Sequence, residues 1–370
     1  MRIIVINPIL YTNETANIKK VKSIKDTMIY HLCLEMKNQG HTPILITAED
    51  YKPILNEEYP FQILFLKTKL KKIFRPNCFP YLSNLKTVLK RINFDFLISS
   101  EVFSMNSLYV SMHYKRKTII WHELAKHNRM MKKIPSKIWY NIIARLCFRN
   151  TRIVARSENA KKFIKNYCNN VSNTIIDHGV DLEEFTFSLE KDKQFIVVSQ
   201  LIKRKRIEGI IESFSDFIIK NKNYKLIIIG SGIEENRLKK MRDELQLTKQ
   251  IVFKGQLTHK EIIPILAKSK ALIINTEKDN NMLSIVESIA TCTPIITTPV
   301  PYNCSYIMKN DLGIITTKLK AEDYIKMIEK NDSFVNNCYN YREKVSNTYH
   351  VKQFIQEGNR VINNDLSEEL

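Results

Sequence analysis

The fold of this 370-residue chain is decided by the stretch Asp279-Asn-Asn-Met-Leu-Ser-Ile-Val-Glu287, in which seven residues separate two acidic ones. The apolar run 271–275 precedes the stretch, and Ala290-Thr-Cys-Thr-Pro294 follows it. A strand, a loop and a helix in this order would bring free backbone N–H groups to the carboxyl edge of a sheet, where open α/β sheets bind anions. The pattern predicts such a site, although an isolated pair of this kind is more often an ordinary joint with solvated carboxylates.

Strand and helix patterns alternate around this stretch, which favours the anion site over the ordinary joint. Buried-strand patterns occupy residues 195–199, 224–229, 250–253 and 271–275, and helix patterns occupy residues 210–219, 234–247 and 260–268. A basic loop, Gln200-Leu-Ile-Lys-Arg-Lys205-Arg206, opens the first of these helices. Strands that alternate with helices of this length imply right-handed crossovers and a parallel sheet, so the sequence predicts an α/β fold.

The same order of parts, over residues 194–299, resembles the donor-binding half of glycosyltransferase family 4, and the acidic stretch is similar to the family's E-x7-E signature with Asp279 in place of the first Glu. Ile176-Asp-His-Gly179-Val-Asp181 also resembles the family's N-G-V-D segment, with His178 where Asn is usual. The resemblance implies a GT-B fold of two Rossmann-like doubly wound domains facing each other across a cleft. We expect an acceptor domain at 1–178, a nucleotide-sugar domain at 179–350, and a helix and tail at 351–370 that return towards the first domain.

The resemblance also implies roles for residues of the donor half. Lys205 stands where the family has a diphosphate-binding lysine, but the arginine that usually accompanies it falls at Gln200, which has neither charge nor a bidentate fork. Arg204, Arg206 or Lys203 could supply the missing charge. Glu287 is expected to accept hydrogen bonds from the ribose, and the backbone of residues 255–257 is expected to hold the base. The expected donor-binding residues are Lys205, Gln200, Arg204, Arg206, Gly230, Gly255, Leu257, Asn280, Asn281, Met282, Leu283 and Glu287, with Asp279 and His122 as catalytic residues. No metal or other cofactor is expected, because GT-B enzymes generally neutralise the diphosphate with basic side chains and helix dipoles.

The first half of the chain predicts a second α/β unit. Strand patterns occupy residues 3–6, 41–46, 94–99 and 118–121. His122 follows the last of these, and the carboxyl end of a parallel strand is where ligands bind. By resemblance, His122 hydrogen-bonds the transferred sugar; the alternative is a structural histidine. The family's glycine-rich first loop corresponds here to residues 7–16, which contain no glycine, although glycine is what lets backbone approach a ligand closely.

The net charge of +20 is concentrated in the first half of the chain. Residues 1–178 hold 30 Lys and Arg against 12 Asp and Glu, whereas residues 179–370 hold 28 against 26. One cluster, at 67–75, lies beside Ile73, Phe74 and Phe79, and a second, at 126–156, includes Trp139, Tyr140, Ile142 and Ile143. Such mixtures attract polyanions, and we expect an anionic membrane surface. The alternatives are a diphosphate-linked acceptor, nucleic acid, for which no binding signature is present, or solvated helix faces whose aromatic residues belong to the core.

The resemblance, taken with these observations, implies a retaining glycosyltransferase that moves a hexose or N-acetylhexosamine from a nucleoside-diphosphate sugar, with UDP expected, to a cell-surface glycan or a lipid-linked acceptor. No apolar run approaches the ~20 residues of a membrane span and no signal peptide is evident, so we expect a cytoplasmic protein associated peripherally with the inner face of the membrane. One alternative is an inactive homologue that serves as an accessory or scaffold subunit, because Gln200, Asp279, the glycine-free loop and Cys292, where the family usually has Gly, depart from the pattern. The other alternative is a basic nucleic-acid-binding protein.

Overall fold

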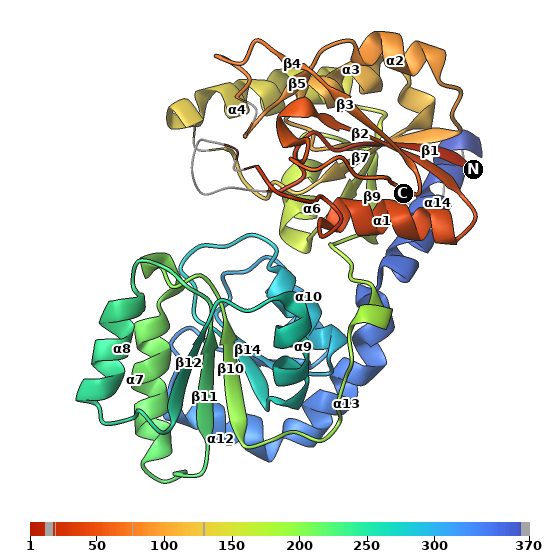
Figure 1. The fold of residues 1–370 in the computed structure, drawn as a ribbon. Coiled ribbons are helices and arrows are strands. Elements are labelled where there is room, and N and C mark those ends of the chain that lie inside the picture. Colours follow the sequence, from red (N-terminus) through yellow and green to blue (C-terminus); the bar gives the residue numbers. More distant parts are fainter. Residues whose placement is uncertain (12–17, 19, 76, 129, 364–370) are drawn as a thin grey trace. The chain divides into compact units, whose positions relative to one another are not determined.

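The computed structural model describes residues 1–11, 18, 20–75, 77–128 and 130–363, and it divides the chain into two compact units (Figure 1). The first unit comprises Met1–Gly179 and Asn347–Leu370, and the second comprises Val180–Ser346. The chain therefore passes between the units twice. Residues 12–16 of the glycine-free loop and the tail at 364–370 lie outside the described residues.

The first unit is built on a parallel sheet with the order β3-β2-β1-β6-β7-β8-β9. The strands are β1 Arg2–Ile6, β2 Thr42–Ala48, β3 Gln62–Leu66, β6 Phe96–Ser100, β7 Thr118–His122, β8 Arg152–Ala155 and β9 Val171–Ile175. The central strands are apolar along nearly their whole length, with Ile3 to Ile6 all buried, as expected for a parallel sheet covered on both faces. A separate antiparallel ribbon pairs β4 Thr68–Lys69 with β5 Tyr81–Leu82.

Helices cover this sheet and connect its strands. They are α1 Met28–Asn38, α2 Leu85–Arg91, α3 Met105–His113, α4 Ile134–Ile138, α5 Arg145–Cys147, α6 Glu158–Lys165 and α14 Asn347–Asn363, with short 3-10 turns at η1 Glu49–Tyr51, η2 Lys115–Lys117 and η3 Met130–Lys133 and a π-helical segment at η4 Trp139–Ala144. The C-terminal helix α14 belongs to the first unit. A Cβ on Gly358 would lie 2.5 Å from the Phe96 ring, and buried Glu357 pairs with buried Arg152 at 2.7 Å.

The second unit has a six-stranded parallel sheet with the order β12-β11-β10-β13-β14-β15. Its strands are β10 Gln194–Val198, β11 Lys225–Ile229, β12 Ile251–Gly255, β13 Ala271–Ile274, β14 Ile295–Thr297 and β15 Gly313–Ile315. Its helices are α7 Ile207–Ile218, α8 Glu235–Glu244, α9 His259–Lys268, α10 Leu283–Ala290, α11 Cys304–Lys309, α12 Ala321–Glu329 and α13 Asn331–Tyr341, with 3-10 turns at η5 Leu182–Glu184, η6 Lys203–Lys205 and η7 Arg342–Val345.

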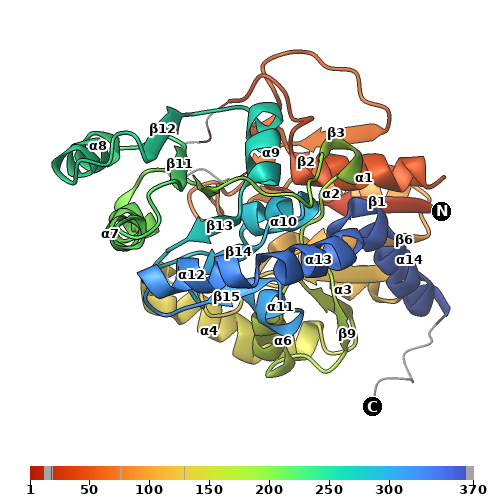
Figure 2. The ribbon, with the colours of Figure 1, turned by 90° about the horizontal axis from the view of Figure 1, so that it is seen from below.

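Two separate cores lie on the two faces of this second sheet. Phe195 and Val197 of β10 pack with α7, α8 and α12, whereas Ile196 packs with α9, α10 and α13. Figure 1 shows α7 and α8 to the left of the strands and α9 and α10 to their right, and the view from below in Figure 2 also keeps these pairs apart. The predicted doubly wound α/β architecture is confirmed.

In both units the strand order reverses next to the first strand, between β1 and β6 and between β10 and β13. Ligands of open parallel sheets bind beyond the carboxyl ends of the strands at such a reversal. The loops that follow these four strands are therefore the places to look for a site. No helix in the described part of the chain is long and apolar enough to cross a bilayer.

Replacing Glu357 by Ala should destabilise the first unit by about 3–5 kcal/mol, because Arg152 would be left as a buried charge without its carboxylate. Both tryptophans of the chain, Trp121 and Trp139, belong to the first unit, so urea unfolding followed by tryptophan fluorescence reports on that unit. The control is Glu329→Ala, which removes an exposed carboxylate from α12 of the second unit. Equal unfolding midpoints for wild type and Glu357→Ala would show that the ion pair does not anchor α14.

Candidate functional site

In the second unit, the loops that follow β10 and β13 meet at one carboxylate. Lys205 Nζ lies 2.8 Å from Asp279 Oδ2, and Arg204 Nη1 lies 2.9 Å from Asp279 Oδ1. Thr276 Oγ1 donates to Asp279 Oδ2 at 2.6 Å, and Glu277 N donates to the Arg204 carbonyl at 2.9 Å. Asp279 thus joins the loop of η6 to the loop after β13, at the reversal of strand order.

This cluster carries an excess of positive charge. Burial by itself would raise the pKa of Asp279, but hydrogen bonds from Lys205 and Thr276 and the charge of Lys205 outweigh it, and the pKa lies below its ordinary value. At neutral pH two cations therefore surround one carboxylate. Lys205 is buried, whereas the side chain of Arg204 is 36% exposed, so Arg204 is the cation more open to an incoming anion.

Two of the expected residues do not join the cluster. Gln200 is exposed and is not among the described residues that contact Asp279. Arg206 pairs instead with Glu277 at 3.6 Å in an exposed contact, and its backbone, with φ 48°, turns the chain into α7. The second cation beside Lys205 is therefore Arg204.

The side chain of Asn303 holds the turn that leads into α10. Asn303 Oδ1 accepts from Met282 N at 3.1 Å, and Asn303 Nδ2 donates to Met282 O at 2.9 Å. The first N–H groups of a helix have no partner within it, and Ser284 Oγ is buried with no hydrogen-bond partner in the described chain. The turn presents four of the expected donor-binding residues, all at least partly exposed: Asn280, Asn281, Met282 and Leu283.

Glu287 is buried in the middle of α10, and its Oε1 lies 3.2 Å from Nδ1 of His259, an exposed residue at the start of α9. The sequence analysis did not single out His259. The available signal was its place just after the loop at 255–257, which was expected to hold the base. This contact joins the start of α9 to the middle of α10.

Glycine is required at position 230 and favoured at position 255 for different physical reasons. A Cβ on Gly230, at φ 132°, would lie 1.8 Å from the Ser199 carbonyl oxygen, so only glycine fits where the loop after β11 passes the end of β10. Gly255 has φ 67° and open space around it, so its conformation alone favours glycine. Leu257 is half-buried and packs against the core beneath α9.

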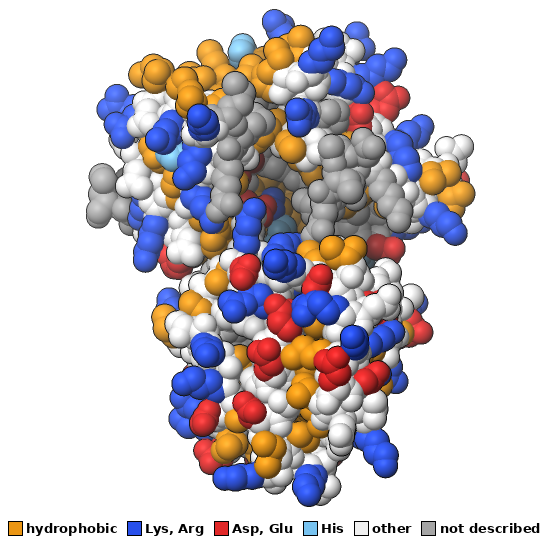
Figure 3. Space-filling model, turned by 90° about the vertical axis from the view of Figure 1, so that its left-hand side faces the viewer, with side chains coloured by type: hydrophobic (Ala, Val, Ile, Leu, Met, Phe, Trp, Pro, Cys, Tyr) orange, Lys and Arg blue, Asp and Glu red, His pale blue; other side chains and the backbone are white. Residues whose placement is uncertain are grey.

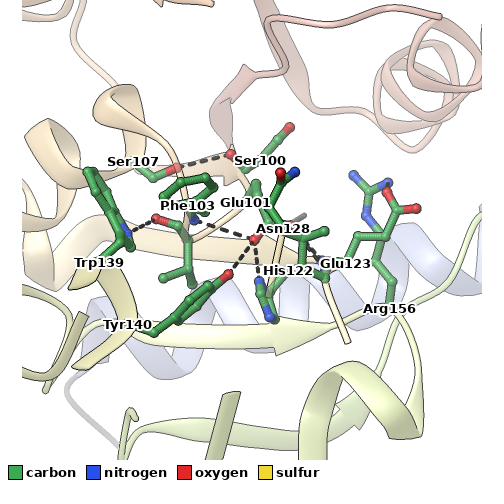
Figure 4. A network of polar contacts seen from close by, with 12 residues as sticks. Ser100, Glu101, Phe103, Ser107, His122, Glu123, Asn128, Trp139, Tyr140 and Arg156 are labelled. Carbon is green, nitrogen blue, oxygen red and sulfur yellow. Dashed lines mark hydrogen bonds and ion pairs between the residues drawn. The ribbon is translucent and has the colours of Figure 1, made fainter. Parts of the chain in front are cut away.

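In the first unit, a buried histidine and a carboxylate form a second polar cluster (Figure 4). His122, the last residue of β7, is fully buried, and its Nδ1 lies 2.6 Å from Glu101 Oε1. The backbone N–H groups of Glu123 and Leu124 donate to Glu101 Oε2 at 3.1 and 3.2 Å, and the Tyr140 hydroxyl donates to Oε1 at 3.4 Å. The backbone N–H of Phe103 also donates to Oε1 at 3.4 Å, so Glu101 gathers five donors around one carboxylate.

These contacts determine which nitrogen of His122 is available. Burial would raise the pKa of Glu101, but His122 and the two backbone donors outweigh it and lower the pKa to about 2. An ionised carboxylate only accepts hydrogen bonds, so Nδ1 of His122 carries a proton. In the neutral ring the lone pair is then on Nε2, which is buried and has no hydrogen-bond partner within the described ranges. Nε2 is therefore the ring nitrogen of His122 that is left for a further hydrogen bond.

Glu101 was missed by the sequence analysis. It directly follows β6 and has φ 69°, a left-handed conformation that is uncommon for residues other than glycine. The available signal was an acidic residue at the end of a strand that neighbours the strand of His122. Beside it, the Ser100 hydroxyl donates to Asn7 Oδ1, which joins the ends of β6 and β1.

No group of three or more His, Cys, Asp or Glu side chains in the described segments is placed to hold a metal ion. Transfer without a metal or other cofactor stays a prediction. Cys292, where the family usually has Gly, keeps the left-handed conformation that glycine would favour, with φ 57°, just after α10. Cys292 in place of Gly therefore does not change the left-handed backbone conformation at this position.

Comparison with known proteins places this geometry in a family. The model described as Glycosyltransferase Family 4 matches residues 26–184, and the model described as Glycosyl transferases group 1 matches residues 181–345. Alpha-monoglucosyldiacylglycerol synthase of Streptococcus pneumoniae is 21% identical over 315 residues, which cover 78% of this chain and 71% of that protein.

Two solved structures show the same fold. Sucrose-phosphate synthase from Thermosynechococcus elongatus superposes with a TM-score of 0.69 at 12% identity, covering 98% of this chain and 99% of its own. The apo form of the lipopolysaccharide outer core galactosyltransferase WaaB superposes with a TM-score of 0.66 at 14% identity, covering 99% of this chain and all of its own. With two family models that adjoin and together span residues 26 to 345, the chain belongs to the family 4 glycosyltransferases of the GT-B fold.

Proposed function

We propose that this glycosyltransferase moves a hexose or N-acetylhexosamine from a UDP-sugar, with retention of configuration, to a glycan or lipid-linked acceptor. The observation that carries the proposal is the convergence of Lys205 and Arg204 on Asp279, beside the start of α10. Cations and helix N–H groups at one carboxyl edge match the needs of a leaving diphosphate.

The chemistry follows from where charge develops. Breaking the anomeric C–O bond leaves negative charge on the β-phosphate and oxocarbenium character on the sugar, so cations must be in place before the bond breaks. Asp279 holds Lys205 and Arg204 in position while no donor is bound, and the diphosphate then shares these cations with it. In our proposal the β-phosphate accepts the proton of the attacking hydroxyl as the new bond forms on the same face of the sugar.

Glu101 and His122 supply the second part of the proposal. Glu101 does not touch the sugar but holds the proton on Nδ1 of His122, which leaves Nε2 to hydrogen-bond the transferred sugar. Glu101 is thus a positioning residue. The scheme is that of a carboxylate that orients an imidazole and selects its tautomer.

The class of acceptor is suggested by a relative. The pneumococcal protein is named as a synthase of alpha-monoglucosyldiacylglycerol, and hence of a glucosylated lipid. We propose a lipid-linked acceptor for this chain as well.

The function is tested by binding and transfer with the wild-type protein and Lys205→Ala. Wild type should bind UDP in calorimetry and form an α-linked product with a lipid acceptor, whereas Lys205→Ala should lower turnover by ~10²–10³, because a preorganised charge at the leaving group is lost. Arg204→Ala should also weaken UDP binding. Lys203→Ala is the matched control, since Lys203 is an exposed lysine of the same turn.

Two outcomes would contradict the proposal. A wild-type protein that binds UDP but neither transfers nor hydrolyses any UDP-sugar would point to the inactive accessory homologue. Unchanged UDP affinity in both Lys205→Ala and Arg204→Ala would remove the diphosphate from this cluster.

Glu287→Gln should weaken UDP binding by about 1.5–3 kcal/mol, the usual contribution of a hydrogen bond to a charged group. The same substitution should be tested with 2′-deoxy-UDP and 3′-deoxy-UDP. For at least one of these nucleotides Glu287→Gln should cause a much smaller loss of affinity, because the hydroxyl that Glu287 holds would already be absent. Glu277→Gln, which changes an exposed carboxylate of the neighbouring loop, is the control. Equal penalties for all three nucleotides would mean that Glu287 only supports α10 and His259.

Glu101→Gln should lower turnover by ~10²–10⁴ with little change in UDP affinity, because the amide no longer selects one tautomer of His122. Nitrogen NMR of the His122 ring should show protonation at Nδ1 in wild type and a mixture of tautomers in the variant. The control is Glu123→Gln, whose carboxylate pairs with Arg156 at 3.1 Å instead of with His122. A variant with the wild-type tautomer and wild-type turnover would reduce Glu101 to a structural residue.

A further inference from the structure

The loop that follows β7 takes part in the polar cluster of the first unit. Its first two residues, Glu123 and Leu124, donate backbone N–H groups to Glu101 Oε2 at 3.1 and 3.2 Å. Oε1 of Glu101 lies 2.6 Å from Nδ1 of His122 (Figure 4). Any movement of this loop would therefore change two of the hydrogen bonds that hold Glu101 beside His122.

The far end of the same loop is fastened by His127. Nδ1 of His127 lies 3.2 Å from the hydroxyl oxygen of Ser136, and Asn128 N donates to that oxygen at 3.2 Å. Nε2 of His127 lies 3.2 Å from the hydroxyl oxygen of Tyr167. Ser136 is buried in α4 and Tyr167 follows α6, so one imidazole ties the loop to two helices.

The His127 ring also belongs to an aromatic cluster that borders His122. Its centroid lies 5.3 Å from that of Phe163 and 5.7 Å from that of Tyr140, in edge-to-face contacts. The Phe163 ring lies nearly parallel to the His122 ring, with centroids 6.3 Å apart and an angle of 15° between the planes. The Tyr140 hydroxyl donates to Glu101 Oε1 at 3.4 Å. His127 thus contacts one ring beside His122 and another that bonds Glu101.

The two aromatic residues at the start of η4 lie in the core. Trp139 Nε1 donates to the Val102 carbonyl at 3.0 Å, and Tyr140 is fully buried. The expectation that these two residues form a surface with the neighbouring lysines is therefore wrong, because helical periodicity turns them inward. A buried ring in a close-packed core has little room to move, so a change in the packing around Tyr140 reaches Glu101.

Burial and two lysines keep the His127 ring neutral at pH 7. Burial lowers the pKa of His127 below its ordinary value, and the charges of Lys137 and Lys133 lower it further. Figure 3 shows that Lys and Arg also prevail over Asp and Glu on the face of the first unit that it draws. A neutral imidazole has one donor and one acceptor nitrogen, and a hydroxyl can donate or accept, so His127 can bond Ser136 and Tyr167 at once.

We propose that His127 is a positioning residue for the transfer reaction, which holds the Glu101–His122 pair in the geometry that transfer needs. Three sets of contacts lead from His127 to this pair: the backbone of the loop, the hydroxyl of Tyr140 and the ring of Phe163. The proposal rests on the role proposed above for His122 and adds a residue that acts on it through others. A displacement of ~1 Å at a reacting group can cost about 10²-fold in rate.

The first test compares turnover and UDP affinity of the full chain in wild type and His127→Ala. Turnover should fall by about 10- to 100-fold with UDP affinity unchanged, because the pair is displaced while the donor half keeps its residues. In a His122→Ala background, His127→Ala should cause no further loss, because all three sets of contacts lead to His122. The control is His113→Ala, which removes an exposed histidine that stacks on Tyr109 in α3 and should behave as wild type.

A second variant and a second measurement make the test independent of folding and of turnover. His127→Phe keeps an aromatic ring in the cluster and removes only the hydrogen bonds to Ser136 and Tyr167, so it should remain folded. Nitrogen NMR should show shifted His122 ring signals in both variants at position 127 and unchanged signals in His113→Ala. A wild-type protein without transferase activity would contradict the proposed function, but the His122 signals would still decide the role of His127.

Three results would overturn the proposal. The first is wild-type turnover with unchanged His122 signals in a folded His127 variant. The second is an equal loss from His127→Ala in wild type and in the His122→Ala background, which would show that His127 acts independently of His122. The third is a lower turnover that accompanies only a lower unfolding midpoint, with unchanged His122 signals, which would assign His127 a purely structural role.

Discussion

In each parallel sheet the strand order reverses at one point, and the chain leaves the two strands at that point towards opposite faces of the sheet. Both polar clusters of this protein lie at such a point. In the second unit the loops after β10 and β13 meet through Lys205 and Asp279. In the first unit the ends of β1 and β6 meet through Asn7 and Ser100, directly beside Glu101. Because hydrogen-bonded pairing sets the position of each strand end, the same backbone constraint that builds the two sheets also places their reactive side chains.

A carboxylate with a lowered pKa stands at the centre of each cluster, and each has a different task. Asp279 pairs with two cations, Lys205 and Arg204, and so fixes the positions of both side chains. Glu101 orients an imidazole, because its carboxylate accepts a hydrogen bond from Nδ1 of His122 and so fixes the ring. The surrounding hydrogen-bond donors offset the cost of removing both ionised carboxylates from water, because a buried charge is stable only when such partners replace water.

Much of the fold could be predicted from the sequence, and less of the site. The apolar strands 195–275 of the second unit and the helices between them were predicted in the right order, with boundaries shifted by one or a few residues: the strand predicted at 250–253 is β12, Ile251–Gly255. The pairing of Arg204 with Asp279 joins residues 75 positions apart, and that of Glu101 with His122 joins residues 21 positions apart. Short sequence patterns cannot predict such a pairing, because it depends on which strands become neighbours in the sheet.

By itself, the sequence determined the two α/β units and the basic first half, because composition and apolar periodicity are properties of neighbouring residues. Only the tertiary structure decided that Arg204 stands beside Lys205 in place of Gln200, and that His122 has a carboxylate partner. It also decided that Trp139 and Tyr140 face the core while Ile138 and Ile142 face outward. The physical reason is the same in each case: periodicity shows that a helix has two faces, but packing against distant segments selects the face that is buried.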